Sequence, residues 1–250
     1  MSERFFLATT PDADRAVLHG DEARHLARVM RAQVGDEIRV FDGRGGEWMA
    51  RVAAVGRDSV SVALGARLPA EPPPLRRLTL AVALPKGERQ KWLIEKITEL
   101  GATSLVPLVT KHGVAEATPA ALERLRRGVI EACKQCGRAT LVEIGGPATL
   151  DDLAARHPQA LRLIADPHGG PLEAALAGHD GRDIVAAVGP EGGFAADELA
   201  AAERAGFTRV SLGRHILRIE TAALALAARL ADVSPSAAID RGRASAPPGR

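Results

Sequence analysis

The chain has 250 residues, of which 46% are hydrophobic and 26% are charged, the proportions of an ordinary soluble globular protein. No stretch approaches the roughly 20 consecutive apolar residues of a membrane-spanning helix. The first ten residues include Glu3 and Arg4 and lack the apolar core of a signal peptide. These features predict a cytoplasmic protein with one large or two modest domains.

The net charge of +2 is unevenly distributed along the chain. Residues 73–150 carry 12 basic and 7 acidic side chains, a net charge of +5, and hold all five lysines of the chain. Residues 1–72 have a net charge of −1, and residues 151–232 have −4. A local basic surface attracts a phosphate backbone. Taken alone, however, the charge favours a solvated helix face over a nucleic-acid surface.

The first part of the chain predicts a small β-barrel that carries one helix. Strands are expected at 36–41, 47–55 and 59–64, and a turn-forming run of Asp and Gly at 42–46 separates the first two. A helix is expected at 21–30. Residues 64–77, which contain Pro69 and Pro72-Pro73-Pro74, form the predicted linker, since three successive prolines suit neither a helix nor a central strand. The barrel domain is therefore placed at 1–70.

After the linker, strands and helices are predicted to alternate, which indicates a mostly parallel sheet with helices on both faces. The expected strands are 78–84, 104–109, 161–165, 183–188 and 207–212, and the expected helices are 88–100, 119–137, 195–205 and 219–231. This second domain is placed at 75–232. The remaining residues, 233–250, are rich in Pro, Ala, Gly, Ser and Arg and are predicted to be a disordered tail.

Two cysteines, Cys133 and Cys136, form a Cys-x-x-Cys motif within the helix predicted at 119–137. Structural zinc needs four ligands, and no second pair of soft ligands lies nearby. A redox pair would follow a thioredoxin-like strand, which is absent here. The sequence therefore favours two reduced structural thiols and no metal.

Two glycine-containing turns follow predicted strands and are candidates for ligand binding. The first is Gly189-Pro190-Glu191-Gly192-Gly193, and the second begins at Leu212-Gly213 and continues to Arg218. Open α/β sheets bind ligands at the carboxyl ends of their strands, and glycine lets the backbone approach a ligand closely. Neither turn is a G-x-G-x-x-G or P-loop motif, and each by itself also fits a plain strand-to-helix turn. Two such turns on neighbouring strands favour one shared cleft.

Seven segments in order along the chain resemble the ribosomal RNA small subunit methyltransferase E family, over about residues 4–231. The similarity lies in Arg4-Phe5-Phe6, His25 with 28–31, Gly35-Asp36, Lys86-Gly87 with 96–101, Gln135 with Arg138, Gly189–Gly193, and 216–222. The family usually has Thr where this chain has Ile219, and often Ser where it has Cys136. Those two side chains are therefore poor choices for predicted contacts.

The resemblance implies a SPOUT-type, trefoil-knotted parallel-sheet domain preceded by a small PUA-like or OB-like barrel. It also implies a homodimer that uses S-adenosyl-L-methionine to methylate N3 of one uridine in 16S ribosomal RNA, within the small ribosomal subunit. The implied cofactor-binding residues are those of the two glycine turns: Gly189, Pro190, Glu191, Gly192, Gly193, Leu212, Gly213, Ile216, Leu217 and Arg218.

Uridine N3 attacks the sulfonium methyl without a metal, so the protein must position the reactants, help the N3 proton leave and hold the charge that spreads onto O2 and O4. Arg218 is the candidate for holding that charge. Glu191 and Glu220 are candidates for the base or for orienting Arg218, and the sequence does not choose between them. The expected RNA-binding residues are Arg4, His25, Arg28 and Arg31 on the barrel, and Lys86, Lys91 and Arg138 on the second domain.

Two alternatives remain open at this stage. One is a related SPOUT methyltransferase that acts on transfer RNA or on a ribose 2′-oxygen. The other is a non-catalytic RNA-binding assembly factor that keeps the fold. The presence of the glycine turns, Arg218 and Glu220 argues against the second alternative. A non-catalytic assembly factor would not bind S-adenosylmethionine.

Overall fold

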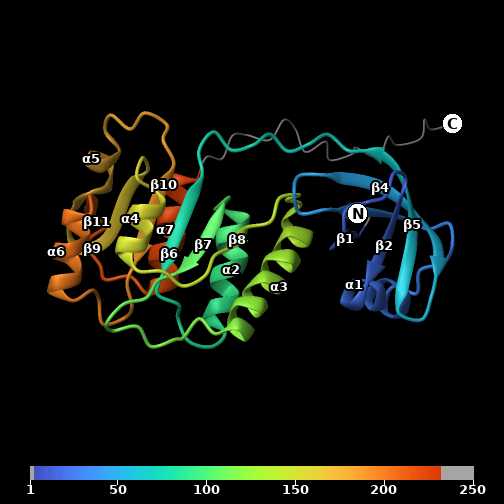
Figure 1. Cartoon of the computed structure of the whole chain (residues 1–250), viewed down its shortest axis with the longest axis horizontal. Coiled ribbons are helices and arrows are strands. Elements are labelled where there is room, and N and C mark those ends of the chain that lie inside the picture. Colours follow the sequence, from blue (N-terminus) through green and yellow to red (C-terminus); the bar gives the residue numbers. More distant parts are fainter. Residues whose placement is uncertain (1–2, 232–250) are drawn as a thin grey trace, which may run out of the picture.

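The computed structural model describes residues 3–231, so the tail predicted at 233–250 lies outside the described residues. Figure 1 shows two units, one formed by the N-terminal elements and the other by the elements from β6 to α7. A long extended segment joins them (Figure 1). Within residues 3–231 the strands form two separate sheets, one of five strands and one of six.

The N-terminal unit is a five-stranded sheet in the order β1-β3-β4-β5-β2. Its strands are β1 (Arg4–Phe6), β2 (Arg15–His19), β3 (Glu37–Phe41), β4 (Glu47–Val55) and β5 (Ser59–Arg67). β1 pairs in parallel with β3, and the other pairs are antiparallel. Phe5, Leu18, Val40, Val52 and Val60 are buried in the core of this unit. The sequence analysis predicted neither β1 nor β2. β1 has three residues, too few to show an alternation of apolar and polar residues, whereas the five residues of β2 do alternate between buried and exposed positions, so its signal was available.

The helical segment of this unit differs from the single helix predicted at 21–30. α1 (Gly20–Arg24) continues directly into a π-helix, η1 (His25–Val29). π-helical turns are rare and occur often at functional sites. Arg31, just beyond η1, has a left-handed backbone with φ of 55°. This backbone is uncommon for a residue other than glycine, and it presents the Arg31 side chain on the surface.

The linker is shorter than predicted. β5 extends through Arg67, which is paired with Trp48 of β4, so the extended connection begins at Leu68 rather than at Leu64. Ala, Leu and Gly at positions 63–66 give little strand signal, but the pairing with β4 overrides this local preference. The exact limits of the two predicted domains remain predictions.

The second unit contains a parallel sheet in the order β11-β9-β10-β6-β7-β8. Its strands are β6 (Leu78–Val82), β7 (Ser104–Pro107), β8 (Glu143–Ile144), β9 (Leu161–Pro171), β10 (Ile184–Val188) and β11 (Phe207–Ser211). Every residue of β6 and β10 is buried, as expected for central strands covered on both faces. The predicted α/β fold class is confirmed.

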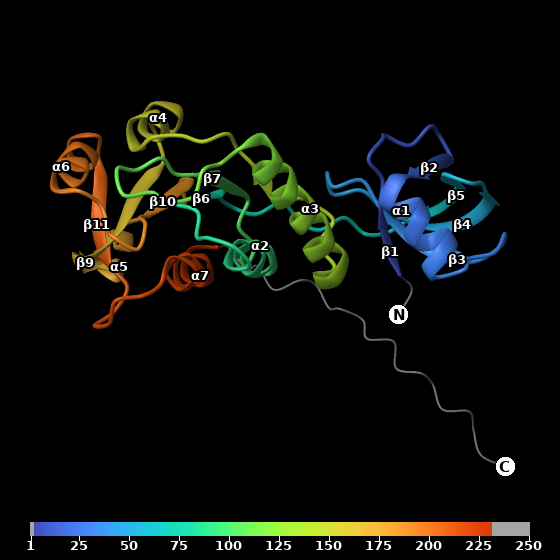
Figure 2. The same ribbon diagram turned by 90° about the horizontal axis from the view of Figure 1, so that it is seen from below.

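Helices cover both faces of this sheet, as Figure 2 shows. α2 (Arg89–Glu99), α3 (Pro119–Cys136) and α7 (Ile219–Leu230) share one core with Leu78, Leu80 and Val82. α4 (Leu150–Arg156) and α6 (Ala196–Arg204) form a second core on the other face with Ala81, Val185 and Ala187. The prediction omitted β8, α4 and the short α5 (Leu172–Leu176), although Thr149 and Asp152 form a capping box that marks the start of α4.

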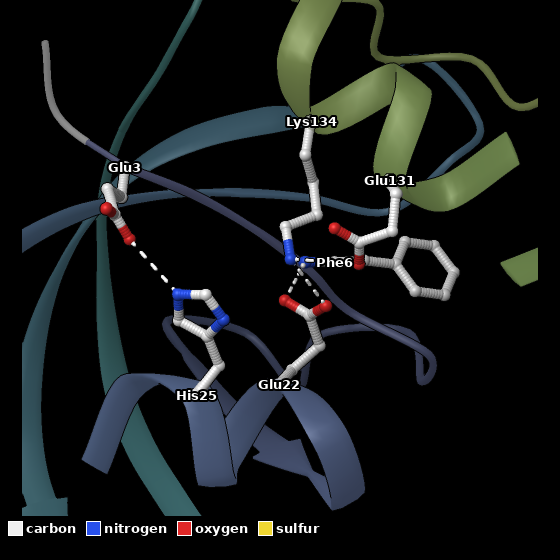
Figure 3. Close-up of polar contacts among 6 residues, drawn as sticks. All are labelled: Glu3, Phe6, Glu22, His25, Glu131 and Lys134. Atoms are coloured by element: carbon white, nitrogen blue, oxygen red, sulfur yellow. Dashed lines mark hydrogen bonds and ion pairs between the residues drawn. The ribbon is translucent and has the colours of Figure 1, made fainter. Parts of the chain in front are cut away.

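The two units meet through buried polar contacts between the barrel and α3. Lys134 of α3 donates to Glu22 at 3.0 Å, and Glu22 also accepts from the backbone N–H of Phe6, as Figure 3 shows. Arg4 forms a bidentate ion pair with Glu47, and it also donates hydrogen bonds to the backbone oxygens of Cys133 and Arg138. The guanidinium of Arg4 therefore connects β1 and β4 to the end of α3.

Backbone hydrogen bonds reinforce this junction. The N–H of Leu141 donates to the oxygen of Gly43, and that of Gly45 donates to Ala139. Gly43 has φ of 73°, and a Cβ at that position would lie 2.8 Å from the Leu141 side chain. The glycine therefore allows the β3–β4 turn to approach the second unit closely.

Cys133 and Cys136 are both free thiols, in agreement with the prediction of reduced structural cysteines. Within residues 3–231 no group of three or more His, Cys, Asp or Glu residues is placed to hold a metal ion. No helix among the same residues is both long and apolar enough to cross a membrane.

Candidate functional site: a pocket at the carboxyl ends of three parallel strands

A pocket of about 530 Å³ opens where strands β10 and β11 end and where β9 runs beyond its pairing with β10. β9 pairs in parallel with both β10 and β11, so the turns that follow these strands emerge at one edge of the sheet. The turn after β10 is 189–193, and the segment after β11 is 212–218. Both line the same pocket. The shared cleft expected from the sequence is therefore present, and its volume suits a small-molecule ligand.

All ten residues predicted to bind the cofactor line this pocket. They are Gly189, Pro190, Glu191, Gly192, Gly193, Leu212, Gly213, Ile216, Leu217 and Arg218. Gly193 and Gly213 have positive φ values of 69° and 142°, which favour glycine. A Cβ on Gly189 would lie 2.7 Å from the Phe194 ring, so this position also requires glycine. The structure brings the residues together, and their contacts with a ligand remain a prediction.

A third segment of the pocket wall, Ala165–His168, was not predicted. Asp166 is buried. Its Oδ2 atom accepts a hydrogen bond from Nε of Arg209 at 2.7 Å and lies 2.6 Å from Nη2 of the same guanidinium. The same carboxylate accepts a hydrogen bond from the backbone N–H of His168. The sequence signal was available, because Asp-Pro-His-Gly-Gly at 166–170 follows an apolar strand just as the turn at 189–193 does.

The segment that follows β7 also contacts the turn at 189–193. The Nδ1 atom of His112 lies 3.1 Å from the oxygen of Gly193. The backbone N–H of Lys111 donates to Glu198, which caps the start of α6. The segment after β7 therefore braces the turn, and the prediction included neither His112 nor Lys111 among the site residues.

The predicted catalytic residues divide into two groups. Arg218 lies exposed on the pocket wall, and within residues 3–231 its guanidinium has no ion-pair partner. Glu191 and Glu220 do not orient Arg218. They both face Arg89, whose guanidinium lies 3.1 Å from Glu191 and 3.9 Å from Glu220. Arg89, at the first position of α2, is a site residue that the sequence reasoning missed, because nothing local distinguishes it from other helix-surface arginines.

The residues of the pocket fit S-adenosylmethionine in shape and chemistry. Val188, Leu212, Ile216, Leu217 and Phe194 provide apolar surface for an adenine ring. The glycine turns expose backbone donors and acceptors, and a buried carboxylate, Asp166, lies on the wall. A few polar groups in a mostly apolar cleft are typical of cofactor sites.

The predicted RNA-binding residues also divide into two groups. Arg28, Arg31, Lys86 and Lys91 are exposed, and His25 is exposed but lies 3.7 Å from Glu3, as Figure 3 shows. Arg4 and Arg138 instead have structural partners. Arg4 lies in the junction described above, and Arg138 donates to the backbone oxygens of Thr98 and Ala102. Their guanidinium groups already have partners within the protein, and their contact with RNA remains a prediction.

Two family models match the chain. The model of an RNA methyltransferase domain matches residues 71–231, and that of an RNA methyltransferase PUA domain matches residues 18–64. The parallel-sheet domain with its pocket, preceded by a PUA barrel, thus defines an RNA methyltransferase with a SPOUT-type fold. The knot of that fold remains a prediction.

Curated relatives narrow this class to one family. The chain is 35% identical over 206 residues to a Synechocystis protein named ribosomal RNA small subunit methyltransferase E, covering 80% of this chain and 67% of the relative. It is 35% identical to the protein of that name from Rickettsia conorii, covering 82% and 84%. The chain belongs to the ribosomal RNA small subunit methyltransferase E family.

Solved structures of similar proteins agree with this assignment. A methyltransferase from Legionella pneumophila, solved with bound SAM, has a TM-score of 0.83 and 26% identity, covering 92% of this chain and 96% of that one. A ribosomal RNA small subunit methyltransferase E from Neisseria gonorrhoeae, bound to S-adenosyl methionine, has the same TM-score with 28% identity and the same coverage.

Proposed function

We propose that this protein transfers a methyl group from S-adenosylmethionine to N3 of one uridine in 16S ribosomal RNA, acting as a homodimer on the small ribosomal subunit. The observation that carries the proposal is the single pocket formed by the turns 189–193 and 212–218. Family membership supports methylation of ribosomal RNA, and the bound cofactor of two similar structures supports the choice of methyl donor.

S-adenosylmethionine supplies a methyl group on a positively charged sulfur that is already a good leaving group. The N3 lone pair of uridine forms the new bond to the methyl carbon, while the carbon–sulfur bond breaks and its electron pair stays on sulfur. The N3 proton passes to a carboxylate of the protein. Methylation of N3 requires an unpaired uridine, because N3 is hidden in a base pair.

We assign the proton acceptor to Glu220 rather than Glu191. Glu220 is the second residue of α7, next to the pocket residues Ile219 and Ala222, and its side chain is only 8% exposed. Its Oε2 atom has no hydrogen-bond partner among the described residues. This oxygen makes no hydrogen bond that a proton would have to replace, but it is buried, and Glu220 is not itself among the residues that line the pocket. Glu191 is 42% exposed, and its closest oxygen is 3.1 Å from Arg89.

We assign to Arg218 the stabilisation of the negative charge that develops on uridine O2 and O4. Its guanidinium is on the pocket wall and has no competing ion pair within residues 3–231. Exposed basic groups then extend the RNA-binding surface: His25, Arg28 and Arg31 on the barrel, and Lys86 and Lys91 near the start of α2. Phosphate contacts from these groups orient the RNA, while the pocket selects the base.

The first prediction concerns Arg218. The variant Arg218→Ala should lower methyl transfer by about 10²–10³-fold, because a donor that stabilises developing charge is lost. Calorimetry should give nearly unchanged binding of S-adenosylmethionine, because the backbone of the turn remains. Methyl transfer is measured with tritiated cofactor on small subunits and on free 16S RNA from cells that lack the protein, and the product is mapped by mass spectrometry.

Arg214→Ala is the matched control, since Arg214 lies in the same segment but does not line the pocket. Full activity of Arg218→Ala would remove Arg218 from the mechanism. Methylation at a transfer RNA or at a ribose 2′-oxygen would replace the proposed substrate. Absence of any heat with S-adenosylmethionine in the unaltered protein would favour the assembly factor.

A further inference from the structure

The end of η1 exposes apolar side chains next to arginines. The run 28–31 reads Arg-Val-Met-Arg, and all four residues are exposed. Val29 is 69% exposed and Met30 is 43% exposed, and Val34, a few residues further on, is 68% exposed. Single apolar residues on a surface are ordinary, but several on one turn, rimmed by polar groups, mark an interaction site. We call residues 28–34 the η1 tip.

The backbone of the η1 tip is held in place by the barrel. Leu26 is buried in the barrel core, so the helical segment already has its core-facing side chain. The N–H of Met30 donates to the oxygen of His25, and the N–H of Ala32 donates to the oxygen of Leu26. A partner would therefore meet a turn whose backbone is already ordered, and binding would cost little backbone entropy.

The charges on the η1 tip are positive. Arg28 and Arg31 are exposed, and among the described residues, 3–231, neither has an ion-pair partner. The neighbouring Arg24, in contrast, pairs with Asp21. Two unpaired guanidinium groups beside an apolar surface fit a ligand with both negative charge and apolar faces. Unpaired RNA has both, because its base faces are free between the phosphates, whereas a duplex stacks those faces on one another.

We propose that the η1 tip binds an unpaired segment of ribosomal RNA. Val29, Met30 and Val34 contact the faces of exposed bases. Arg28 and Arg31 hold the phosphates of the same segment. The inference rests on the proposed function, from which it takes the RNA substrate, and it adds base contacts to the phosphate contacts of the arginines. The barrel is thereby selective for unpaired RNA, since a duplex gains the arginine contacts alone.

Two double variants test the two kinds of contact separately. Val29→Ser with Met30→Ser removes apolar surface, and Arg28→Gln with Arg31→Gln removes charge. Filter binding of free 16S ribosomal RNA is measured over a range of salt concentrations. The serine variant should bind on the order of tenfold more weakly, because apolar contact area is lost, with an unchanged salt dependence. The glutamine variant should reduce the slope of log affinity against log salt by about 1.4, or about 0.7 for each single-strand phosphate.

RNA oligonucleotides of equal length, one single-stranded and one fully duplex, test the selectivity. The serine variant should lose affinity for the single strand and keep its affinity for the duplex. Leu75→Ser, which removes an 83% exposed apolar side chain outside the η1 tip, is the control and should bind both like the unaltered protein. Equal losses on both oligonucleotides would overturn the selectivity for unpaired RNA. Thermal melts check folding, and should the serine variant not fold, Met30→Gln takes its place.

Crosslinking identifies the partner directly. Protein labelled with photo-methionine is irradiated on small ribosomal subunits, and the crosslinks that disappear in Met30→Leu are assigned to Met30. These crosslinks should map to an unpaired nucleotide of 16S ribosomal RNA. Crosslinks from Met30 to a ribosomal protein or to a second copy of this chain would overturn the proposal, because another partner would then cover the η1 tip.

The same variants separate this inference from the proposed function. In the serine variant, KM for small subunits should rise about tenfold, while kcat and calorimetric binding of S-adenosylmethionine stay unchanged, because the η1 tip acts on RNA binding alone. If both double variants bind RNA like the unaltered protein, the role of the η1 tip is refuted and the methylation of N3 stands. If the unaltered protein methylates another position while Met30 still crosslinks to an unpaired nucleotide, the proposed function fails and the inference survives.

Discussion

Cys133 and Cys136 lie three residues apart on α3, but their surroundings differ. Cys133 is fully buried, and Cys136 is exposed. Burial raises the pKa of the Cys133 thiol to about 12, and the neighbouring Cys136 adds to this effect. The thiolate is the reactive form of cysteine, so the folded protein protects Cys133 through its pKa as well as its burial.

The second prediction is therefore that a thiol reagent at pH 8 labels Cys136 of the native protein readily and Cys133 hardly at all. Both residues should react in urea, where the pKa of Cys133 returns to its ordinary value. The raised pKa also means that the unfolded state loses its proton first, so the free energy of unfolding should fall as the pH rises from 9.0 towards about 12. Equal labelling of both thiols in the native protein would contradict this description.

Among the structural elements, β9 contributes most to the site beyond the two predicted turns. It continues past the pocket to Pro171, and its register with β11 shifts between Arg209 and Val210. A Cβ on Gly169 would lie 2.5 Å from the backbone nitrogen of Val210, so glycine permits this close passage. Arg209 of β11 and Asp166 of β9 fix the strand end where it becomes the pocket wall.

The third prediction concerns this ion pair. Asp166→Ala should weaken binding of S-adenosylmethionine by about tenfold, because the 165–168 segment loses both its tie to Arg209 and the hydrogen bond to the backbone of His168. Calorimetry measures the affinity, and a thermal melt measures stability, which should decrease. Asp180→Ala, which removes an exposed pair with Arg182, is the control and should change neither. Unaltered affinity in Asp166→Ala would show that the segment needs no such tie.

Across the whole molecule, the junction between the barrel and α3 fixes the N-terminal unit to the second unit. Burial lowers the pKa of Lys134, but the hydrogen bond from Lys134 to Glu22 and the charges of Glu22 and Glu131 raise it by more, so the pKa lies above its ordinary value of 10.5. The raised pKa of Lys134 therefore stabilises the fold throughout the neutral range, and this contribution is lost as the pH rises above 10.5.

The fourth prediction is a double-mutant cycle on this pair. Lys134→Ala and Glu22→Ala should each destabilise the protein, and their coupling energy should be about 1–3 kcal/mol, because both side chains are largely buried. Urea unfolding at neutral pH measures it. The exposed pair Arg51–Glu37 is the matched control, with an expected coupling below about 1 kcal/mol. A Lys134–Glu22 coupling as small as that of the control would show that the backbone contacts alone hold the junction.

The local sequence determined much of this architecture. Apolar runs such as 78–82 and 184–188 are strands because they are buried on both faces, and glycine and proline at their ends mark the turns. The same signals predict the two turns of the pocket from the local sequence alone. Short elements such as β1 and β8 were missed, since two or three residues show no periodicity and depend on a neighbouring strand.

Only the tertiary structure decided which charged groups meet. The sequence could place Glu191, Glu220 and Arg218 near one cleft, but the packing of α2 against α7 gave both glutamates Arg89 as their ion-pair partner. Among the described residues, 3–231, Arg218 has no such partner. The same is true of Arg4 and Arg138, which the sequence predicted as RNA contacts and whose guanidinium groups donate to backbone oxygens in the structure. Strand and turn preferences act between near neighbours in the chain, whereas ion pairs depend on residues brought together from distant segments by the burial of apolar surface.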